Sequence, residues 1–396
     1  MRIGERIGTG RVLGLGPGAG LILRSMVLRR MAGALAVCVL IGGAPELKAA
    51  GAVGATGAVE AGKAAALVSP WDVHPVKMKA GNYSCATVAT LPHDVVAFDY
   101  YSDAQHSVKD DKRYAAYTAV KEQYTSVTGA AERAADHFQA SGETGAAACV
   151  MKILLPQAQA DVMTGSMSSN QANYVQNWTL GALAIAYLKV RQVGPEGLGA
   201  TPEQIAAVQA WMDKVGGQVE GYFAARRAKG TNDGRNNHLY WAGFAAIAAG
   251  IAANDRELYG WGVSTYKDGV DEIADDGTLP LEMARGQRAL HYHLFALAPL
   301  VTMAELGTVN GEDLYAYKGA RLHLLVSRAL AGLVDNHYFS TKAGAVQDTP
   351  EKGRVKSDDV VWVMPYLRRY PDAGISALLN QGGREPYDYL GGLPPQ

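Results

Sequence analysis

The stretch YVQNWTLGALAIAYLKVR, which spans residues 174–191, decides the fold class. It predicts a helix from Tyr174 to Val193 with apolar residues on most of its faces. A surface helix carries one apolar stripe, whereas a helix that is apolar nearly all round is buried. The stretch therefore predicts a helix that other elements cover on two sides.

Further helices are predicted on both sides of this stretch. The chain is rich in Ala and Leu and poor in β-branched runs, which favours helix over sheet. Thr201-Pro202 is a typical helix start, because Thr caps the first turn and Pro is tolerated inside it. Besides 174–193, the predicted helices span residues 114–141, 202–228, 238–253, 286–306, 314–333 and 358–369.

These helices recur at roughly 40-residue intervals as antiparallel pairs. Neither the Rossmann nor the P-loop glycine pattern occurs. We predict a single all-α domain, residues 69–396, made of helix hairpins arranged around a ring. An up-down bundle would bury the same helices but provides no natural cleft.

The first 50 residues differ from the rest. Basic Arg29-Arg30 precedes an apolar run, residues 31–43, and small residues at Ala49-Ala50. This order is typical of a secretory signal peptide, with translation starting at Met26. The run is short for a bilayer span, although a short membrane anchor is the alternative. Residues 51–68 read as a disordered Gly/Ala spacer.

Charge and cysteine content also follow from this division. Residues 1–50 hold seven of the 37 basic and two of the 38 acidic residues, which leaves a net charge of about −6. An anionic partner therefore requires basic groups concentrated in a cleft. Once Cys38 leaves with the signal peptide, Cys85 and Cys149 remain. Two cysteines in an exported chain usually form a disulfide, and two unpaired buried thiols are the alternative.

Two segments carry the chemistry. Arg235-Asn-Asn-His-Leu-Tyr-Trp241 follows a glycine-bearing loop and opens a helix. Helix starts favour bound negative charge, and this segment holds more polar residues than capping requires. In Leu279-Pro-Leu-Glu-Met-Ala-Arg-Gly-Gln-Arg-Ala-Leu-His-Tyr-His293, Arg285 and Tyr292 are seven residues apart. In one helix they would share a face.

These two segments resemble the central motifs of the alginate lyases of polysaccharide lyase family 5. The helix 174–191 resembles the family helix with a substrate-stacking Trp, here Trp178. VWVMPYLRRYP at 361–371 and LGG at 390–392 resemble its C-terminal signature. The Cys85–Cys149 spacing resembles a family disulfide. The resemblance covers residues 75–392 and implies an incomplete (α/α) toroid or barrel with a deep cleft.

The resemblance implies a metal-free and cofactor-free β-elimination on a uronic-acid polymer. Asn237, His238 and Arg285 would neutralise the uronate carboxylate, because the C5 proton is only weakly acidic. Tyr292 would remove that proton and return it to the leaving oxygen. A tyrosine base needs a lowered pKa, which Arg285 and His238 would supply. His238 is the alternative base for polymers of opposite C5 configuration.

Substrate contacts are expected from a second set of residues, some of which could equally be core. The set is Trp178, Arg235, Tyr240, Trp241, Arg288, Tyr100 and Tyr101. The family's lid loop with a Lys and a Tyr is only partly matched at 98–109, where Lys109 is the candidate Lys. Tyr389 replaces the arginine often found before LGG. Both departures leave the uronate open: polymannuronate, polyglucuronate or a mixed polymer.

Two other functions remain open. A glycoside hydrolase needs two opposed carboxylates, for which only Asp276 and Glu282 lie near the motifs. A non-catalytic polysaccharide-binding protein would keep Trp178 and the arginines without needing Tyr292. His291 and His293 face different sides of a helix, which argues against a metal site. We expect a periplasmic or secreted monomer that binds an anionic polysaccharide and neither nucleic acid nor membrane.

Overall fold

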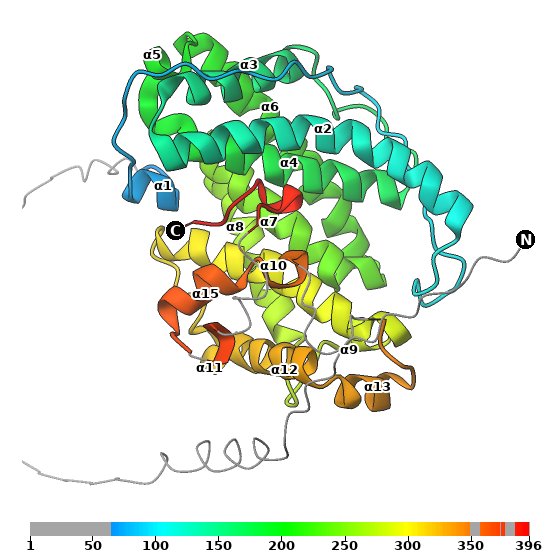
Figure 1. The fold of residues 1–396 in the computed structure, drawn as a ribbon. Helices are drawn as coiled ribbons and strands as arrows, with labels where there is room; N and C mark the ends of the chain where they lie inside the picture. Colours follow the sequence, from blue (N-terminus) through cyan, green and yellow to red (C-terminus); the bar gives the residue numbers. More distant parts are fainter. Residues whose placement is uncertain (1–64, 349–356, 373, 377–384, 396) are drawn as a thin grey trace, which may run out of the picture. The chain divides into compact units, whose positions relative to one another are not determined.

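Helix α4 (Asn170–Val190) carries the stretch that decides the fold. In the computed structural model, every α4 residue after Asn170 is buried. The helices α2 (Asp111–Ser141), α6 (Pro202–Ala228) and α7 (Asn237–Ala253) pack against it. The prediction of a helix covered on more than one side is therefore confirmed (Figure 1). The structure describes residues 65–348, 357–372, 374–376 and 385–395.

The remaining long helices form neighbouring pairs along the chain. Packed pairs are α2 with α3 (Thr144–Gln159), α7 with α8 (Arg256–Asp271), and α10 (Ala289–Thr308) with α12 (Leu322–Val334). The described residues form isolated bridges but no strand, so the all-α class is confirmed. The short helices are α1 (Pro70–Val73), α5 (Gly194–Leu198), α9 (Pro280–Met283), α11 (Tyr317–Ala320), α13 (His337–Ala343), α14 (Ser357–Val360), α15 (Val363–Arg369), η1 (Arg191–Val193), η2 (Asn232–Gly234), η3 (Gly286–Arg288) and η4 (Asp388–Leu390).

Some predicted boundaries are confirmed and others are wrong. Thr201 caps α6 by accepting a hydrogen bond from the Gln204 amide, with Pro202 in the first turn, as predicted. The helix predicted from residue 314 begins only at Leu322. Lys318 and Gly319 have positive φ angles there, 51° and 67°, which break a right-handed helix.

The N-terminal predictions lie mostly outside the described residues. The predicted signal peptide, 1–50, lies wholly outside them, as does most of the spacer 51–68. The spacer's end is ordered, however, because Leu67 is buried and its amide donates to the Asn254 side chain at 2.8 Å. The ordered chain therefore begins before the predicted boundary at residue 69, within a compact unit that spans Ala64–Gln396.

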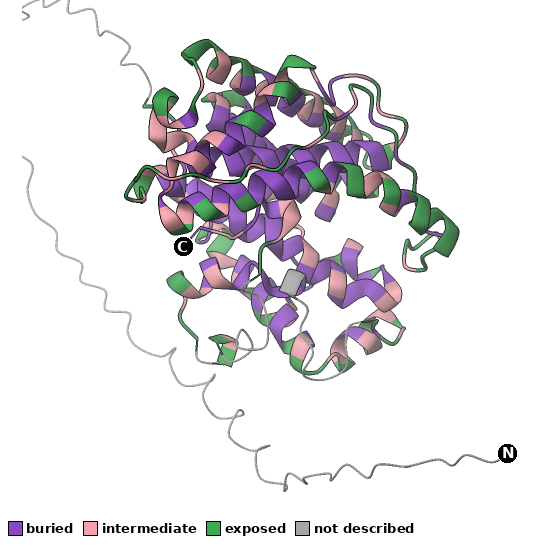
Figure 2. Ribbon diagram, turned by 45° about the horizontal axis from the view of Figure 1, so that its top comes forward, coloured by how far each residue is buried: buried purple, intermediate pink, exposed green. Residues whose placement is uncertain are grey.

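Figure 2 shows that the buried residues gather where the helices pack against one another. The segment Gly286–Thr308, which includes α10, is long and apolar enough to cross a membrane by length and composition alone. Its most apolar window is 89% buried inside the protein. This helix therefore belongs to the core.

A disulfide between Cys85 and Cys149 ties the extended segment before α2 to α3, as predicted. It joins residues 64 positions apart. Such a cross-link restricts the unfolded chain, and for a loop of this length the chain-entropy model gives about 4 kcal/mol. We expect the Cys85→Ser/Cys149→Ser variant to lose about that much free energy of unfolding, measured by urea denaturation. An unchanged urea midpoint would contradict this expectation.

His293 on α10 makes stability depend on pH. It is fully buried, its Nδ1 lies 2.7 Å from the Ala289 oxygen, and its Nε2 accepts from the Leu279 amide at 2.9 Å. Only a neutral ring satisfies both contacts. Burial lowers the pKa of His293 from 6.5 to about 4.

In the unfolded chain His293 is protonated below about pH 6.5. In the folded chain it is protonated only below about pH 4. Stability should be lost as the pH falls through this window, by about 3 kcal/mol in total from this residue. We expect His293→Gln to be less stable at pH 7 but to show a shallower loss between pH 6.5 and pH 4. Urea denaturation across this range checks it, and a slope equal to that of the wild type would exclude the role of His293.

Candidate active site

A cavity of about 490 Å³ lies between the loop before α2, α4, the start of α7 and the segment around α9. Polar and aromatic side chains from distant parts of the chain meet in it, which is the usual character of a ligand site. Its lining residues include the following: Tyr100, Tyr101, His106, Tyr174, Trp178, Arg226, Asp233, Asn236, His238 and Arg285. The cavity thus unites the two central motifs with the predicted lid and with α4.

His238 stands in the first turn of α7 and lines this cavity. The Asn236 side chain caps the helix by accepting from the His238 amide at 3.0 Å. The imidazole stacks on Tyr174, with ring centroids 3.8 Å apart and planes inclined by 17°. Its Nδ1 has no hydrogen-bond partner among the described residues. Burial, and then the charge of Arg285, lowers the pKa of His238 to about 3, so the ring is neutral at pH 7.

Arg285 lies directly over Tyr292, with its guanidinium carbon 3.5 Å from the ring centroid. Arg285 was expected to lie on the same helix as Tyr292. Gly286 has a φ of 56°, however, so the α10 helix does not extend back to Arg285. The contact arises across this break instead. The guanidinium also donates to the backbone oxygens of Gln105 at 2.9 Å and His106 at 2.6 Å.

The Tyr292 hydroxyl lies behind this arginine and is covered by Tyr101. The two hydroxyl oxygens are 2.5 Å apart, and Arg288 contacts both of them. Burial raises the pKa of the Tyr292 phenol, and the opposing effects of Arg285 and Arg288 do not reverse the shift. The expectation of a lowered tyrosine pKa is therefore wrong for the ligand-free protein. Desolvation of the phenolate outweighs the attraction of nearby cations.

Asn237 is brought to the motif but not to the cavity wall. It is fully buried, and both its backbone and side-chain amides donate to Glu282 Oε1 at 2.8 Å. Its neighbour Asn236 lines the cavity instead. Asn237 therefore joins the start of α7 to α9 through Glu282, whose pKa is raised by burial.

The predicted lid residues divide between the cavity and its surroundings. Tyr101 and Tyr100 line the cavity, and Tyr100 packs between Tyr101 and Tyr117. Lys109 lies over the Tyr114 ring, 4.1 Å from its centroid, and does not line the cavity. The structure thus brings the lid tyrosines to the site and leaves Lys109 outside it.

Three residues that were expected to contact the substrate do not line the cavity. Tyr240 is 1% exposed and donates its hydroxyl to the Arg235 oxygen, and Trp241 is 0% exposed. Trp241 packs against Phe244 and Phe295 in the core. Arg235 forms an ion pair with Glu272 and lies outside the cavity.

Arg288 is buried beside the reacting groups rather than on the cavity wall. Its Nε lies 3.2 Å from an Asp348 oxygen, while its Nη1 contacts the two tyrosine hydroxyls. A fixed cation in this place stabilises negative charge on either tyrosine oxygen. Its position fits support of Tyr292 better than direct sugar contact.

A polar group that sequence reasoning missed supports His238. Asp233 accepts from the Tyr174 hydroxyl at 2.8 Å and from the Arg226 guanidinium at 2.7 and 2.9 Å. Although burial alone would raise it, the hydrogen bonds from Arg226 lower the pKa of Asp233. The chain of contacts holds the Tyr174 ring on which His238 stacks. The only local sequence signal was the polar loop before the motif.

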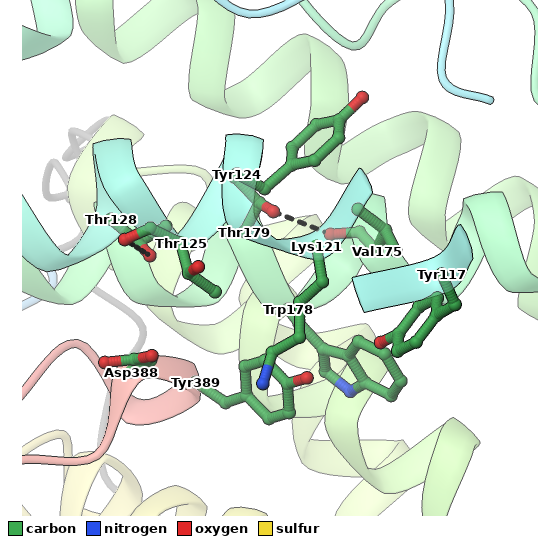
Figure 3. A pocket seen from close by; sticks show the side chains of 10 residues that line it. All are labelled: Tyr117, Lys121, Tyr124, Thr125, Thr128, Val175, Trp178, Thr179, Asp388 and Tyr389. Carbon is green, nitrogen blue, oxygen red and sulfur yellow. Dashed lines mark hydrogen bonds between the residues drawn. The ribbon is translucent and has the colours of Figure 1, made fainter. Parts of the chain in front are cut away.

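Trp178 lines the cavity as predicted, but one face of its ring is already covered. Tyr389 stacks on it, with centroids 4.8 Å apart and planes inclined by 13° (Figure 3). Tyr389, which stands where an arginine was expected, therefore backs Trp178 and does not itself line the cavity.

Asp276 and Glu282, the two carboxylates considered for a hydrolase, do not line the cavity. Asp276 accepts from Tyr338 at 2.5 Å and pairs with Lys342, and Glu282 is buried against Asn237. The two histidines considered for a metal are also separated. His293 is used in the core, and His291 lies 3.6 Å from Asp359. Among the described residues, no group of three or more His, Cys, Asp or Glu side chains is placed to hold a metal ion.

Known proteins are similar to this chain in sequence and in fold. The family model described as alginate lyase matches residues 94–339. A polysaccharide lyase of Stenotrophomonas maltophilia is 35% identical over 309 residues, covering 76% of this chain and 86% of that protein. An alginate lyase of Azotobacter vinelandii is 30% identical over 320 residues, covering 80% and 84%.

Among solved structures, alginate lyase A1-III from Sphingomonas species A1 superposes with a TM-score of 0.64 at 21% identity. The superposition covers 83% of this chain and 95% of that one. This likeness confirms the predicted (α/α) toroid. With the family match over 94–339, the chain belongs to the alginate lyase family.

Proposed function

We propose that this polysaccharide lyase cleaves the 1,4-glycosidic bond of a polyuronate by β-elimination, with poly-β-D-mannuronate or alginate as the substrate. The carrying observation is the contact of Arg285 with Tyr292 at the edge of a cavity that also holds neutral His238. A fixed cation, a proton-transferring hydroxyl and an uncharged imidazole are the groups that this reaction needs. Several relatives named alginate lyase support the choice of substrate.

The reaction balances as follows. The C5–H bond and the C4–O4 bond break, a C4=C5 double bond forms, and the proton passes to the leaving O4. Negative charge develops on the C5 carboxylate in the transition state, where Arg285 would stabilise it. In the described structure Arg285 is bound to two lid oxygens, so the substrate carboxylate would take their place.

The identity of the base depends on the sugar. In mannuronate the C5 proton and O4 lie on the same face, so Tyr292 would both take and return the proton. The Tyr101 hydroxyl is hydrogen-bonded to the Tyr292 hydroxyl at 2.5 Å, and the substrate would replace Tyr101 in this contact. Because His238 is neutral and its Nδ1 lacks a partner among the described residues, it would serve as base for the opposite C5 configuration.

An absorbance assay tests the function. Purified protein is incubated with polymannuronate, polyguluronate, polyglucuronate and hyaluronan, and unsaturated uronate ends are followed by their ultraviolet absorbance. We expect the fastest rise with polymannuronate. New reducing ends without this absorbance would instead indicate hydrolysis. Binding without cleavage of any polymer would indicate a non-catalytic binding protein.

We also propose that the chain acts in the periplasm, or after secretion, as a monomer. The basic–apolar–small order of residues 1–50 supports export, and the Cys85–Cys149 disulfide fits an oxidising compartment. Mass spectrometry of the mature N-terminus after cell fractionation tests the first part, and sedimentation tests the second. An uncleaved chain in the cytoplasm would contradict export.

A further inference from the structure

The imidazole of His238 is held by its ring face and not by its nitrogen atoms. Its Nδ1 has no hydrogen-bond partner, and no described residue holds its Nε2 by a hydrogen bond. The ring stacks on Tyr174 at a centroid distance of 3.8 Å, while Trp178 lies farther away, at 6.2 Å. The orientation of a functional histidine is commonly set by a hydrogen bond to one ring nitrogen. In this site the Tyr174 ring takes that part.

Tyr174, on α4, is fixed through its hydroxyl. The hydroxyl donates to Asp233 Oδ2 at 2.8 Å, and the ring packs on Phe223 of α6 with centroids 6.2 Å apart. Burial, and then the charge of Asp233, raises the pKa of Tyr174, so the phenol stays protonated and continues to donate. The position of the ring beside His238 therefore depends on Asp233.

Asp233, on η2, is itself fixed by Arg226 on α6. The Arg226 Nε lies 2.9 Å from each carboxylate oxygen, and its Nη2 lies 2.7 Å from Oδ1. Paired contacts of this kind are strong and define the geometry of both groups. The helices α4, α6 and α7 pack against one another (Figure 1), and these contacts join them beside the cavity.

The same carboxylate controls the charge of the cavity. Arg226 and Arg285 both line it, and each could bind a uronate carboxylate. Asp233 balances the charge of Arg226, whereas Arg285 donates to two backbone oxygens and forms no ion pair among the described residues. An anionic chain is therefore attracted to Arg285, which lies over Tyr292, more strongly than to Arg226.

We propose that Asp233 is a positioning residue of the lyase reaction with two effects. Through the Tyr174 ring it holds the imidazole of His238 in place. Through Arg226 it keeps a competing cation neutralised, so that the reacting uronate carboxylate binds Arg285. This inference rests on the proposed function, and it leaves the proton transfer to other groups.

Asp233→Asn is the main test, because it keeps the size of the side chain and removes its charge. We expect kcat on polymannuronate to fall by about tenfold to a hundredfold, as misplacement of groups in an active site does. KM should fall as well, by about twofold to fivefold, which is the usual worth of a partly exposed ion pair, because Arg226 is then free to bind the polymer. A loss of folded enzyme alone would lower kcat and leave KM unchanged. Adding Arg226→Met should return KM to the wild-type value and leave kcat low.

The next arginine along the chain provides the control. Arg227 pairs with Asp268 through two nitrogens, at 2.5 and 2.6 Å, and neither residue lines the cavity. Asp268→Asn removes the same charge from an arginine pair of the same kind. It should leave kcat and KM within about twofold of the wild-type values.

A second measurement does not depend on activity. The ring of His238 lies on the face of Tyr174, which shifts the imidazole protons upfield in NMR spectra of histidine-labelled protein. The loss of a signal in His238→Gln assigns it. We expect Asp233→Asn to move this signal toward the position of an unstacked histidine, and Tyr174→Phe, which loses only the hydroxyl, to move it in the same direction. Asp268→Asn should leave it in place.

The outcomes separate the two proposals. An unchanged His238 signal in both Asp233→Asn and Tyr174→Phe would overturn the positioning of the imidazole. An unchanged or higher KM in Asp233→Asn would overturn the control of charge through Arg226. Absence of cleavage of every polymer by the wild type would refute the proposed function, and the NMR signal would still decide whether Asp233 positions His238.

Discussion

Tyr292→Phe should lower kcat on polymannuronate by about a thousandfold, within the usual range for loss of a general acid–base group. The substitution removes a hydroxyl that Arg288 contacts, while it keeps the ring over which Arg285 lies. The substrate cavity does not depend on this hydroxyl. Binding of the polymer should therefore change little, so the loss falls on kcat and not on KM.

The raised pKa of Tyr292 adds a second reason to expect a large loss of activity in Tyr292→Phe. Burial keeps the phenol protonated at neutral pH in the ligand-free protein. A protonated phenol is a good donor to the leaving oxygen but takes up the C5 proton only as its own proton departs. Phenylalanine supplies neither step, and water is a poor substitute in a site that a lid tyrosine covers.

Tyr240→Phe is the matched control. Tyr240 is buried, as Tyr292 is, and its hydroxyl donates to a backbone oxygen, but it does not line the cavity. We expect kcat to stay within about twofold of the wild type, with at most about 1–2 kcal/mol lost in stability. Absorbance kinetics and thermal unfolding are measured for both variants. If Tyr292→Phe turned over within tenfold of the wild type, Tyr292 would not be the proton-transferring group.

The sequence alone predicts best the helices whose own pattern of apolar residues shows that they are buried. Helices α4, α7 and α10 are apolar nearly all round, so burial could be inferred without knowledge of their partners. Two long helices were not predicted. Helix α3 carries Pro156, and α8 carries three glycines, which local propensity disfavours.

The reason for two of the glycines in α8 is tertiary. A Cβ atom on Gly262 would lie 2.6 Å from the Gly243 oxygen of α7, and one on Gly269 would lie 2.8 Å from the Tyr240 ring. Close packing of α8 on α7 therefore favours a residue that local propensity disfavours. No property of the α8 segment by itself shows this, because the atoms that crowd these glycines belong to another helix, α7.

Some features of the candidate site could also be predicted from the sequence, and others could not. The two motifs predicted that His238, Arg285 and Tyr292 act together, and the structure brings His238 and Arg285 to one cavity with Tyr292 behind. The sequence did not show where each side chain of a motif points. Tyr240 and Trp241, for example, were expected at the substrate but are buried and do not line the cavity. The contacts of Asp233 with Tyr174 and Arg226 join three separate segments, so no local pattern could reveal them.

Arg285→Met should lower kcat on polymannuronate by about a hundredfold to a thousandfold, the usual cost of removing one preorganised donor to a developing anion. Arg285 and Arg226 are the arginines that line the cavity. Arg226 is already paired with Asp233, with both of its contacting nitrogens within 2.9 Å of a carboxylate oxygen. Arg285 is therefore the cation available to a substrate carboxylate.

Arg285→Lys separates charge from geometry. The guanidinium binds two lid oxygens from Nε and Nη2 at once, a fork that an ammonium group does not reproduce. The lysine keeps the positive charge but holds it on a flexible stem. We expect activity between those of Arg285→Met and the wild type, with a higher KM, because the carboxylate loses one of two parallel contacts.

Arg235→Met provides the control for both variants. Arg235 lies in the other motif and has the same charge, but it pairs with Glu272 at 2.9 and 3.0 Å outside the cavity. Loss of this half-exposed pair should cost at most about 1 kcal/mol and leave kcat within about twofold. Equal losses in Arg285→Met and Arg235→Met would show that overall positive charge draws in the polymer. A loss confined to Arg285→Met would locate transition-state stabilisation at this guanidinium, because Arg285 lines the cavity and Arg235 does not.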